Sequence, residues 1–159
     1  MTVEKAVGAL LHGQGLSLVT AESCTGGLMA HRITNVSGSS AYYLGGFVAY
    51  AYEAKEILLG VKHETLLAYG AVSEETALEM ARGVRQRLGA DVGVSITGIA
   101  GPTGGMPGKQ VGLTYVALAA RDAGLCERHV WQGDRLANKE QSVEAAFRLL
   151  LTYLQERSG

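Results

Sequence analysis

The stretch that indicates the fold is LSLVTAESCTGG, residues 16–27. Its first part, 16–21, is a short apolar run rich in β-forming residues, which is typical of a central strand buried on both faces. ESCTGG follows this run directly, and in 27–35 apolar residues recur near the 3.6-residue period of a helix. A strand, a glycine turn and a helix in immediate succession predict an α/β fold.

Strands and helices continue to alternate on both sides of this stretch. A leading helix is predicted over residues 2–12. The later predicted elements are a strand at 43–50, helical turns at 53–59 and 64–69, a helix from its Ser73 cap to Leu88, strands at 92–97, 111–119 and 127–132, and a last helix capped by Asn138 with Gln141. With parallel pairing early and an antiparallel final hairpin, we expect a single domain over residues 1–159. It is predicted to be a three-layer α/β/α structure with a central mixed sheet.

Composition and charge narrow the class of protein. Lys and Arg number 14 and Asp and Glu number 15, so the net charge of −1 leaves no basic surface for nucleic acid or an anionic membrane. The two cysteines, Cys24 and Cys126, cannot form a disulfide framework, and no apolar run approaches the ~18 residues of a membrane span. We therefore expect a cytoplasmic protein whose partners include neither nucleic acid nor a membrane.

Glycines mark places where a backbone or a ligand comes close. The chain has 22 of them, about twice the average usage. Gly45 and Gly46, inside a predicted strand, indicate a bulge or a close approach. In 92–97, bulky residues alternate with small ones, so we expect a close neighbour over the small face. The loop 98–112 holds six glycines and both prolines. So many glycines weaken folding, which favours a ligand-binding role for this loop.

Ligands of open α/β sheets bind beyond the carboxyl ends of the strands, so the segments that follow strands are the candidate sites. The first is 22–27, where Ser23 offers a hydroxyl and Cys24 offers a thiol. A helix N-terminus at the same place offers N–H groups to an oxyanion or a phosphate. The alternative interpretation is an N-cap followed by glycines that permit tight packing.

Two further segments follow strands. Tyr50 ends a strand and Lys55 comes about one and a half helical turns later, so a desolvated lysine beside a phenol would be suited to take a proton from a serine. The alternative is a surface tyrosine and a solvated lysine. The loop 97–105 offers consecutive N–H groups that suit an anion, or else it is a hinge.

Several common sites are missing from the sequence. Its four histidines are not spaced as metal ligands, so no metal site is expected. Residues 104–110, GGMPGKQ, are one residue short of a P-loop and have Gln where Ser or Thr would hold magnesium, which argues against an NTPase. There is also no GxSxG elbow and no SxxK motif.

The remaining motifs occur in a familiar order. They are AESCTGG, VSGSS, GGFVAY with EAK, GAVSEE with MA, TGIAGPTGG, KQVGLTY and the triplet Gly133-Asp134-Arg135. This combination resembles the C-terminal domain of the CinA competence/damage-inducible family, whose stand-alone form is the nicotinamide mononucleotide (NMN) deamidase PncC. The resemblance covers about residues 3–155. The larger CinA proteins carry an additional N-terminal domain, for which this chain is too short, so we expect the amidohydrolase domain alone.

The resemblance implies hydrolysis of the NMN carboxamide to nicotinic acid mononucleotide and ammonia, without a metal or organic cofactor. The family's catalytic Ser, Tyr and Lys match Ser23, Tyr50 and Lys55. Where the family usually has Ser-Asn after the tyrosine, this chain has Ala51-Tyr52, and the ring of Tyr52 would offer the substrate a contact surface in their place. The residues expected to contact the substrate are Cys24, Thr25, Gly26, Gly46, Thr97, Gly98, Gly101 and Arg135.

Within this prediction, the substrate's phosphate would suit either the glycine loop 98–105 or the guanidinium of Arg135. Three alternatives remain open at this point: Cys24 as the nucleophile, a non-catalytic nucleotide-binding module of the same family, and hydrolysis of another small amide. A homo-oligomer, most simply a dimer, is also expected, because a small α/β domain often covers a sheet edge with a symmetric partner.

Overall fold

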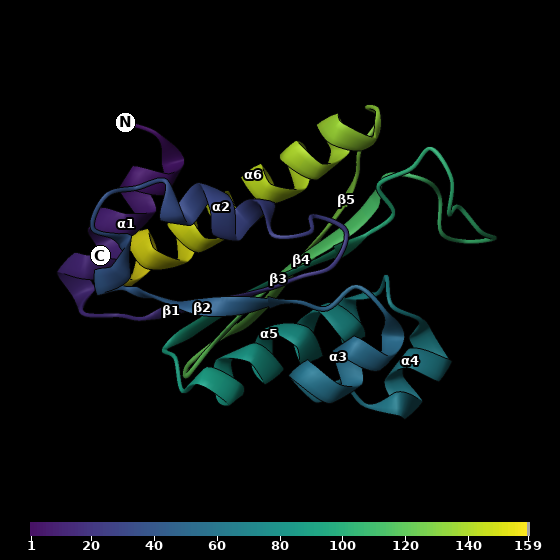
Figure 1. Cartoon of the computed structure of the whole chain (residues 1–159), viewed down its shortest axis with the longest axis horizontal. Coiled ribbons are helices and arrows are strands. Elements are labelled where there is room, and N and C mark those ends of the chain that lie inside the picture. The colour runs from purple at the N-terminus through teal and green to yellow at the C-terminus, as the bar shows by residue number, and fades with distance from the viewer. Residues whose placement is uncertain (159) are drawn as a thin grey trace.

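A computed structural model describes residues 1–158 of the chain. It contains the helices α1 (Val3–Gln14), α2 (Leu28–Thr34), α3 (Tyr52–Leu59), α4 (His63–Tyr69), α5 (Glu74–Leu88) and α6 (Arg135–Ser158), and the short 3-10 helix η1 (Ser39–Ala41). The strands are β1 (Leu18–Glu22), β2 (Tyr43–Val48), β3 (Val92–Gly98), β4 (Leu113–Ala120) and β5 (Gly124–Val130). Helices α1, α2 and α6 cover one face of the sheet, and α3, α4 and α5 cover the other (Figure 1). The predicted three-layer α/β/α structure is confirmed.

The central sheet is mixed, with the strand order β2-β1-β3-β4-β5. Strand β1 runs parallel to β2 and β3, whereas β3 pairs with β4 and β4 with β5 in antiparallel fashion. The predicted change from parallel to antiparallel pairing is therefore confirmed. Because β1, β2 and β3 are parallel, the segments that follow them meet at one end of the sheet.

Strand β1 is the buried central strand that its apolar sequence predicts, and all five of its residues are buried. Successive side chains of a strand point to opposite faces. Leu18 packs in the core beneath α1, α2 and α6, whereas Val19 and Ala21 pack in the core on the side of α3 and α5. The same alternation at the end of the strand sends Glu22 towards α2 and Ser23 towards α3.

The small residues of the sheet allow the close approach that the sequence predicts. A Cβ atom on Gly93 would lie 2.4 Å from the carbonyl oxygen of Ala81 in α5. Ser95 Oγ donates a 2.6 Å hydrogen bond to another α5 carbonyl, that of Ala77. At Gly46 a Cβ atom would lie 2.3 Å from Thr20 Oγ1, and the β1–β2 register shifts just before this point, as for a bulge. Helix α5 is thus the neighbour over the small face of β3.

The predicted cap of the last helix is wrong. Helix α6 begins at Arg135, and the Oδ1 atom of Asp134 accepts a 2.8 Å hydrogen bond from the Ala137 N–H. Asn138 is instead buried within the helix, where its Oδ1 accepts the Gly133 N–H and its Nδ2 donates to the Ala100 carbonyl. An aspartate one turn earlier was available to cap the helix, so the asparagine side chain is free to join two loops.

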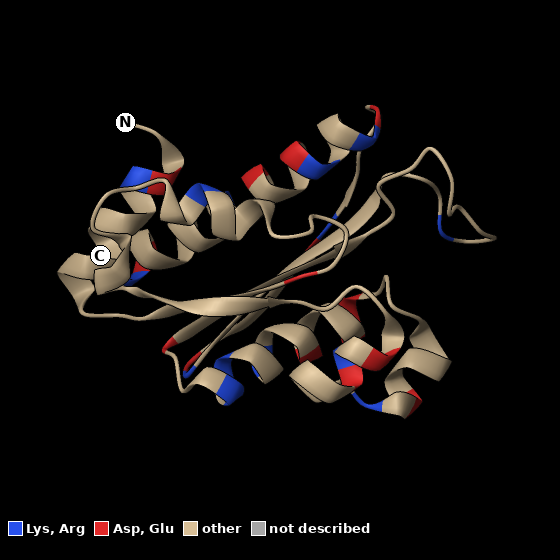
Figure 2. Ribbon diagram, viewed as in Figure 1, with Lys and Arg blue, Asp and Glu red and all other residues tan. Residues whose placement is uncertain are grey.

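The last strand also differs from its prediction. β5 begins at Gly124, three residues earlier than the predicted 127, because a tight turn closes with a 2.9 Å bond from the Ala120 N–H to the Ala123 carbonyl. Within residues 1–158, no helix carries an apolar stretch long enough to cross a bilayer. Acidic and basic positions are interspersed over both helical layers, while the sheet carries few of either (Figure 2).

Candidate active site

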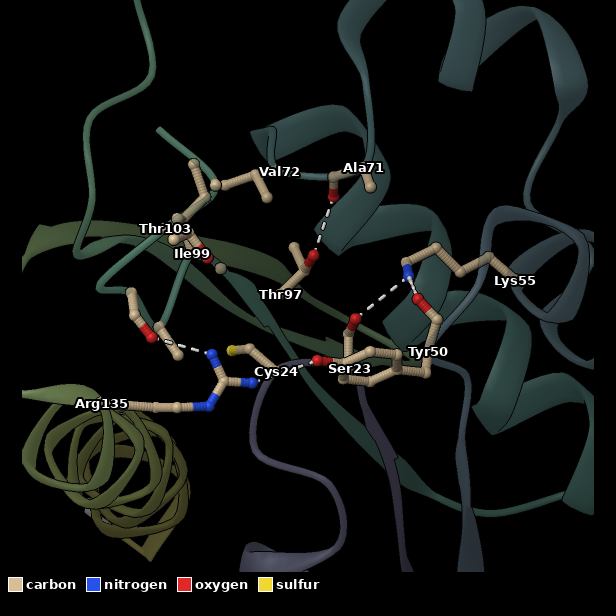
Figure 3. Close-up of a pocket in the computed structure, with 14 residues that line it drawn as sticks. Ser23, Cys24, Tyr50, Lys55, Ala71, Val72, Thr97, Ile99, Thr103 and Arg135 are labelled. Atoms are coloured by element: carbon tan, nitrogen blue, oxygen red, sulfur yellow. Dashed lines mark hydrogen bonds between the residues drawn. The ribbon is translucent and has the colours of Figure 1, made fainter. Parts of the chain in front are cut away.

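A cavity of about 300 Å³ opens where β1, β2 and β3 end, which brings the three candidate segments together (Figure 3). This volume lies at the lower end of the range for small-molecule sites. Its lining residues are Ser23, Cys24, Tyr50, Lys55, Ala71, Val72, Thr97, Gly98, Ile99, Ala100, Gly101, Thr103, Gly104 and Arg135.

Lys55 is the residue with the most unusual environment in this cavity. Helix α3 carries it, and only 1% of its surface is exposed. Its Nζ atom lies 3.1 Å from Ser23 Oγ, 2.9 Å from the Ala49 carbonyl oxygen and 3.1 Å from the Tyr50 carbonyl oxygen. Burial disfavours the ammonium form and lowers the pKa of Lys55 from 10.5 to about 8.

The partners of Lys55 determine how its amine is oriented. Carbonyl oxygens only accept hydrogen bonds, so the carbonyls of Ala49 and Tyr50 engage two N–H groups of the amine. The remaining tetrahedral position faces Ser23 Oγ. In the neutral amine this position is the lone pair, which can accept the serine proton. A lysine with a pKa near 8 is uncharged often enough near neutral pH to act as a base.

Ser23 is held at the end of β1 by its own backbone. Its N–H donates a 3.0 Å bond to the Ile96 carbonyl of β3, and its carbonyl accepts a 3.1 Å bond from the Gly26 N–H. The serine therefore sits on a tight turn anchored to the neighbouring strand. The hydroxyl and the amine of Lys55, which are 32 positions apart in sequence, are in direct contact.

Cys24 also lines the cavity, but its environment opposes ionisation. Burial is the largest effect and raises the pKa of the Cys24 thiol to about 12. Its own backbone N–H lowers this pKa, the negative charge of Glu22 raises it, and the charges of Lys139 and Lys55 have smaller lowering effects. Because the thiolate is the reactive form of cysteine, this thiol is poorly suited to be a nucleophile at neutral pH. The contact of Lys55 Nζ with Ser23 Oγ, together with the raised pKa of the thiol, favours Ser23 over Cys24.

The N-terminus of α2 is occupied by a protein carboxylate. Glu22, which is 1% exposed, accepts hydrogen bonds from Thr25 Oγ1 at 2.6 Å, the Met29 N–H at 2.9 Å and the Ala30 N–H at 3.0 Å. The N-cap residue of α2, Gly27, has no side chain that could make these bonds. The positive end of the helix dipole is thus already neutralised, and its first-turn N–H groups are not available to a substrate anion. This role of Glu22 is not predicted from the sequence, although Glu22 is a carboxylate at the strand end directly before the glycine turn.

The phenol of Tyr50 points towards Arg135, not towards the serine. Arg135 Nη2 lies 3.2 Å from Tyr50 Oη, and Arg135 Nη1 donates a 2.8 Å bond to the Gly101 carbonyl (Figure 3). Tyr50 contacts Lys55 through its backbone carbonyl, while 62% of the tyrosine's surface is exposed. In the structure, therefore, the Lys55 amine contacts the Ser23 hydroxyl, whereas the Tyr50 phenol contacts the Arg135 guanidinium instead of the serine.

The third segment, after β3, forms one wall of the cavity. Thr97 Oγ1 donates a 2.8 Å hydrogen bond to the Ala71 carbonyl, and the Ala71 N–H donates to Tyr52 Oη at 3.3 Å. Ala71, in the connection between α4 and α5, is not predicted from the sequence, since nothing local distinguishes it.

Gly98 is required by packing, because a Cβ atom there would lie 2.5 Å from Thr114 Oγ1. Gly101 has a left-handed φ of +85°.

Three of the predicted substrate contacts lie outside the cavity lining. Thr25 is buried and donates its hydroxyl proton to Glu22. Gly46 lies within β2 against Thr20. Gly26 is exposed on the turn that follows the serine.

The loop 97–105 does not form the expected continuous run of free N–H groups, because the Ile99 N–H donates to the Leu113 carbonyl at 2.9 Å. Within residues 1–158, no cluster of three or more His, Cys, Asp or Glu side chains could hold a metal ion.

Comparison with known proteins identifies the family. The model of the CinA C-terminal domain matches residues 1–154. The chain belongs to the CinA C-terminal domain family. A CinA-like protein from Chloroherpeton thalassium is 50% identical over 154 residues, which cover 94% of this chain and 37% of that protein. A CinA-like protein from Chlorobium limicola is 50% identical over 163 residues, covering 99% of this chain and 38% of that protein. The chain thus spans little more than a third of these curated CinA relatives.

Solved CinA-superfamily structures share the whole fold. Competence damage-inducible protein A from Klebsiella pneumoniae superposes with a TM-score of 0.93 at 34% identity, and the match covers 96% of this chain and 95% of that one. A competence/damage inducible protein from Agrobacterium tumefaciens gives a TM-score of 0.87 at 41% identity, covering 96% and 95% of the two chains. The predicted resemblance to the CinA family is therefore confirmed, and so is the fold.

Proposed function

We propose that this CinA-family chain is a nicotinamide-nucleotide amidase that hydrolyses NMN to nicotinic acid mononucleotide and ammonia. The observation that carries the proposal is the contact of 3.1 Å between Lys55 Nζ and Ser23 Oγ inside the cavity. Amide hydrolysis requires a nucleophile with a base beside it, and this pair can supply both. The family resemblance supplies the substrate.

In the first step, neutral Lys55 takes the proton of Ser23 as Oγ attacks the carboxamide carbon. The resulting ammonium is stabilised by the carbonyls of Ala49 and Tyr50, which already bind two of its protons. The tetrahedral intermediate places negative charge on the former amide oxygen, and this charge needs N–H donors. We assign that role to the backbone N–H of Cys24, which lines the cavity directly after Ser23, because the Gly26 N–H is engaged by the Ser23 carbonyl.

In the second step, the Lys55 ammonium donates its proton to the departing nitrogen. The C–N bond breaks, ammonia leaves, and an ester between Ser23 and the nicotinoyl group remains. Water then attacks this ester, with Lys55 acting again as the base, and nicotinic acid mononucleotide is released as Ser23 recovers its proton. No metal or organic cofactor takes part in either step.

The reaction is tested by measuring ammonia and nicotinic acid mononucleotide formed from NMN, with nicotinamide and nicotinamide riboside as comparison substrates. The Ser23→Ala variant is expected to lose nearly all activity, since removal of a nucleophile costs far more than removal of a single donor. Cys24→Ala is the matched control and should retain activity. An active Ser23→Ala enzyme or an inactive but folded Cys24→Ala enzyme would overturn the assignment of the nucleophile.

The same assay separates the proposal from its alternatives. A non-catalytic nucleotide-binding module would bind NMN in calorimetry but release no ammonia from it. Hydrolysis of a different small amide would appear as ammonia from another member of a substrate panel, since only the pocket contacts differ between such enzymes. Either result would replace the proposed substrate or activity.

A further inference from the structure

The α4–α5 connection, residues 70–73, forms one wall of the candidate active site. Its residues Ala71 and Val72 line the cavity, and Figure 3 shows both across the cavity from α6. Thr97 Oγ1 of β3 donates a 2.8 Å hydrogen bond to the Ala71 carbonyl, and the Ala71 N–H donates to Tyr52 Oη of α3 at 3.3 Å. Two hydrogen bonds at a single residue thus fix this wall between β3 and α3.

A further contact reaches the end of α4 from the loop 98–112. Lys109 Nζ donates a hydrogen bond to the carbonyl of Tyr69, which is the last residue of α4. Lys109 is half-buried, although residues 102–108 are exposed. A tight turn presents the lysine, and in this turn Met106 and Lys109 exchange two backbone hydrogen bonds of 2.9 Å. Lys109 therefore links the outer part of the loop to α4.

Helix electrostatics favour a cation at this position. The last carbonyls of a helix have no partners within the helix and carry the negative end of its dipole, so a positive charge beside them is stabilising. Helix α4 has no basic residue in its own last turn. Lys109 supplies the missing charge from a position 40 residues later in the sequence.

Gly70 is the point at which the lysine and the tyrosine converge. Its φ is +79°, and a Cβ atom on it would lie 2.7 Å from Lys109 Nζ and 3.8 Å from Tyr52 Oη. A side chain at this position would therefore displace the lysine amine. Because the loop also contributes Ile99 and Thr103 to the cavity lining, the contact of Lys109 with α4 joins two walls of the cavity.

We infer that Lys109 is a positioning residue, which together with Tyr52 holds the wall formed by Ala71 and Val72 where substrate binding requires it. Neither Lys109 nor Tyr52 is among the residues that line the cavity, so both act through this wall and neither touches the substrate. The inference rests on the proposed function and adds a condition to it. The loop 98–112 must be linked to α4 for the cavity to bind the substrate with full affinity.

The inference is tested with Lys109→Met, which removes the amine but keeps a side chain of similar length, and with Lys109→Arg, which can still donate to a carbonyl. Lys62→Met is the matched control, because it removes an exposed positive charge at the opposite end of α4. Lys109→Met should raise KM for NMN about fivefold, because fewer molecules hold the cavity in its binding form. Lys109→Arg should restore most of the affinity, and Lys62→Met should behave as the parent enzyme.

The division of the effect between KM and kcat distinguishes positioning from a general loss of structure. In Lys109→Met, kcat and its pH dependence should match those of the parent enzyme, because the contact of Lys55 with Ser23 does not involve the loop. A KM for NMN that Lys109→Met leaves unchanged, or a loss that falls on kcat instead, overturns the inference.

Tyr52→Phe tests the second contact, because it removes only the phenol oxygen that accepts the Ala71 N–H. It should raise KM for NMN about twofold, since a hydrogen bond between neutral groups is weaker than one made by an ammonium. Tyr69→Phe is its control, since it removes the hydroxyl of an exposed tyrosine but keeps the carbonyl that Lys109 contacts. Equal KM values in the two tyrosine variants would remove Tyr52 from the inference.

Hydrogen exchange keeps the test separate from the proposed activity. Amide exchange is followed by mass spectrometry in the parent protein, Lys109→Met and Lys62→Met, all without substrate. Peptides that cover residues 69–73 and 98–112 should exchange about threefold faster in Lys109→Met alone. If NMN is not hydrolysed but exchange is faster in this variant, the link between the loop and α4 stands and the proposed reaction falls. If the three proteins exchange alike, the inference falls whatever the fate of NMN.

Discussion

The buried amine of Lys55 should make the stability of the protein depend on pH in a measurable way, independent of any substrate. The pKa of this lysine is about 8 in the folded chain and 10.5 as a free side chain. Between these values the unfolded chain binds a proton at Lys55 that the folded chain has released. Because stability rises with pH wherever the unfolded state binds more protons, the folded state gains stability from pH 8 upwards.

The size of this gain follows from the shift. Each pH unit between the two pKa values contributes about 1.4 kcal/mol, so the gain between pH 7 and 9.5 is about 2 kcal/mol. The gain in folding stability reaches its full value only above pH 10.5, the pKa of the lysine in the unfolded chain. Below pH 8 both states are protonated at Lys55, and its contribution to the slope vanishes.

The Lys55→Met variant isolates this contribution. It removes the titrating group, while all other groups are common to both proteins and cancel in the difference between their unfolding free energies. Urea unfolding at equal protein concentration, at pH 7, 8, 9 and 9.5, gives that difference. Lys55→Gln, which keeps a donor for one of the two carbonyls, serves if the methionine variant does not fold.

Lys5→Met, at an exposed lysine, is the control and should leave the difference constant across this range. The expected result for Lys55→Met is that the parent protein gains about 2 kcal/mol relative to the variant between pH 7 and 9.5. A difference that stays flat would mean that Lys55 is not held in the desolvated position, and the base assigned to the reaction would have to be another group.

The remaining predictions concern activity, packing and assembly. For the proposed reaction, kcat/KM should rise about tenfold from pH 7 to pH 9 as Lys55 becomes neutral, and a rate that falls over this range would contradict a lysine base. Incubation with EDTA should leave the ammonia assay unchanged, since no step uses a metal ion. Gly46→Ala should destabilise the protein by about 1–3 kcal/mol in urea unfolding, because its Cβ would lie 2.5 Å from the Thr20 carbonyl oxygen, whereas Gly13→Ala, with nothing within 4 Å, should not destabilise it in this way. Val48, 49% exposed on the edge strand β2, should contribute to a dimer contact, so light scattering should give a dimer for the parent protein and a monomer for Val48→Lys.

Local sequence was sufficient for most of the fold because each element carries its own signal. The apolar residues 16–21 predict a strand buried on both faces, and β1 is buried throughout. The alternation of small and bulky residues in 92–97 predicts a close neighbour, which is α5. The exceptions are the starts of β5 and α6. At α6, Asp134 and Asn138 are both good caps, and Asn138 is instead held by contacts with Gly133 and Ala100 that form only in the folded chain.

The sequence by itself determined which chemistry is present: a serine at the end of a strand, a lysine 32 positions later and an arginine after the last strand. Tertiary structure alone decided how they act. The charge state of Lys55 depends on its burial and on the carbonyls that surround it, and the phenol of Tyr50 meets Arg135 instead of Ser23. Glu22 closes the end of α2 through contacts seven and eight positions away. Periodicity reports which face of an element is buried, but pKa values and hydrogen-bond partners depend on groups that only folding brings within a few ångströms.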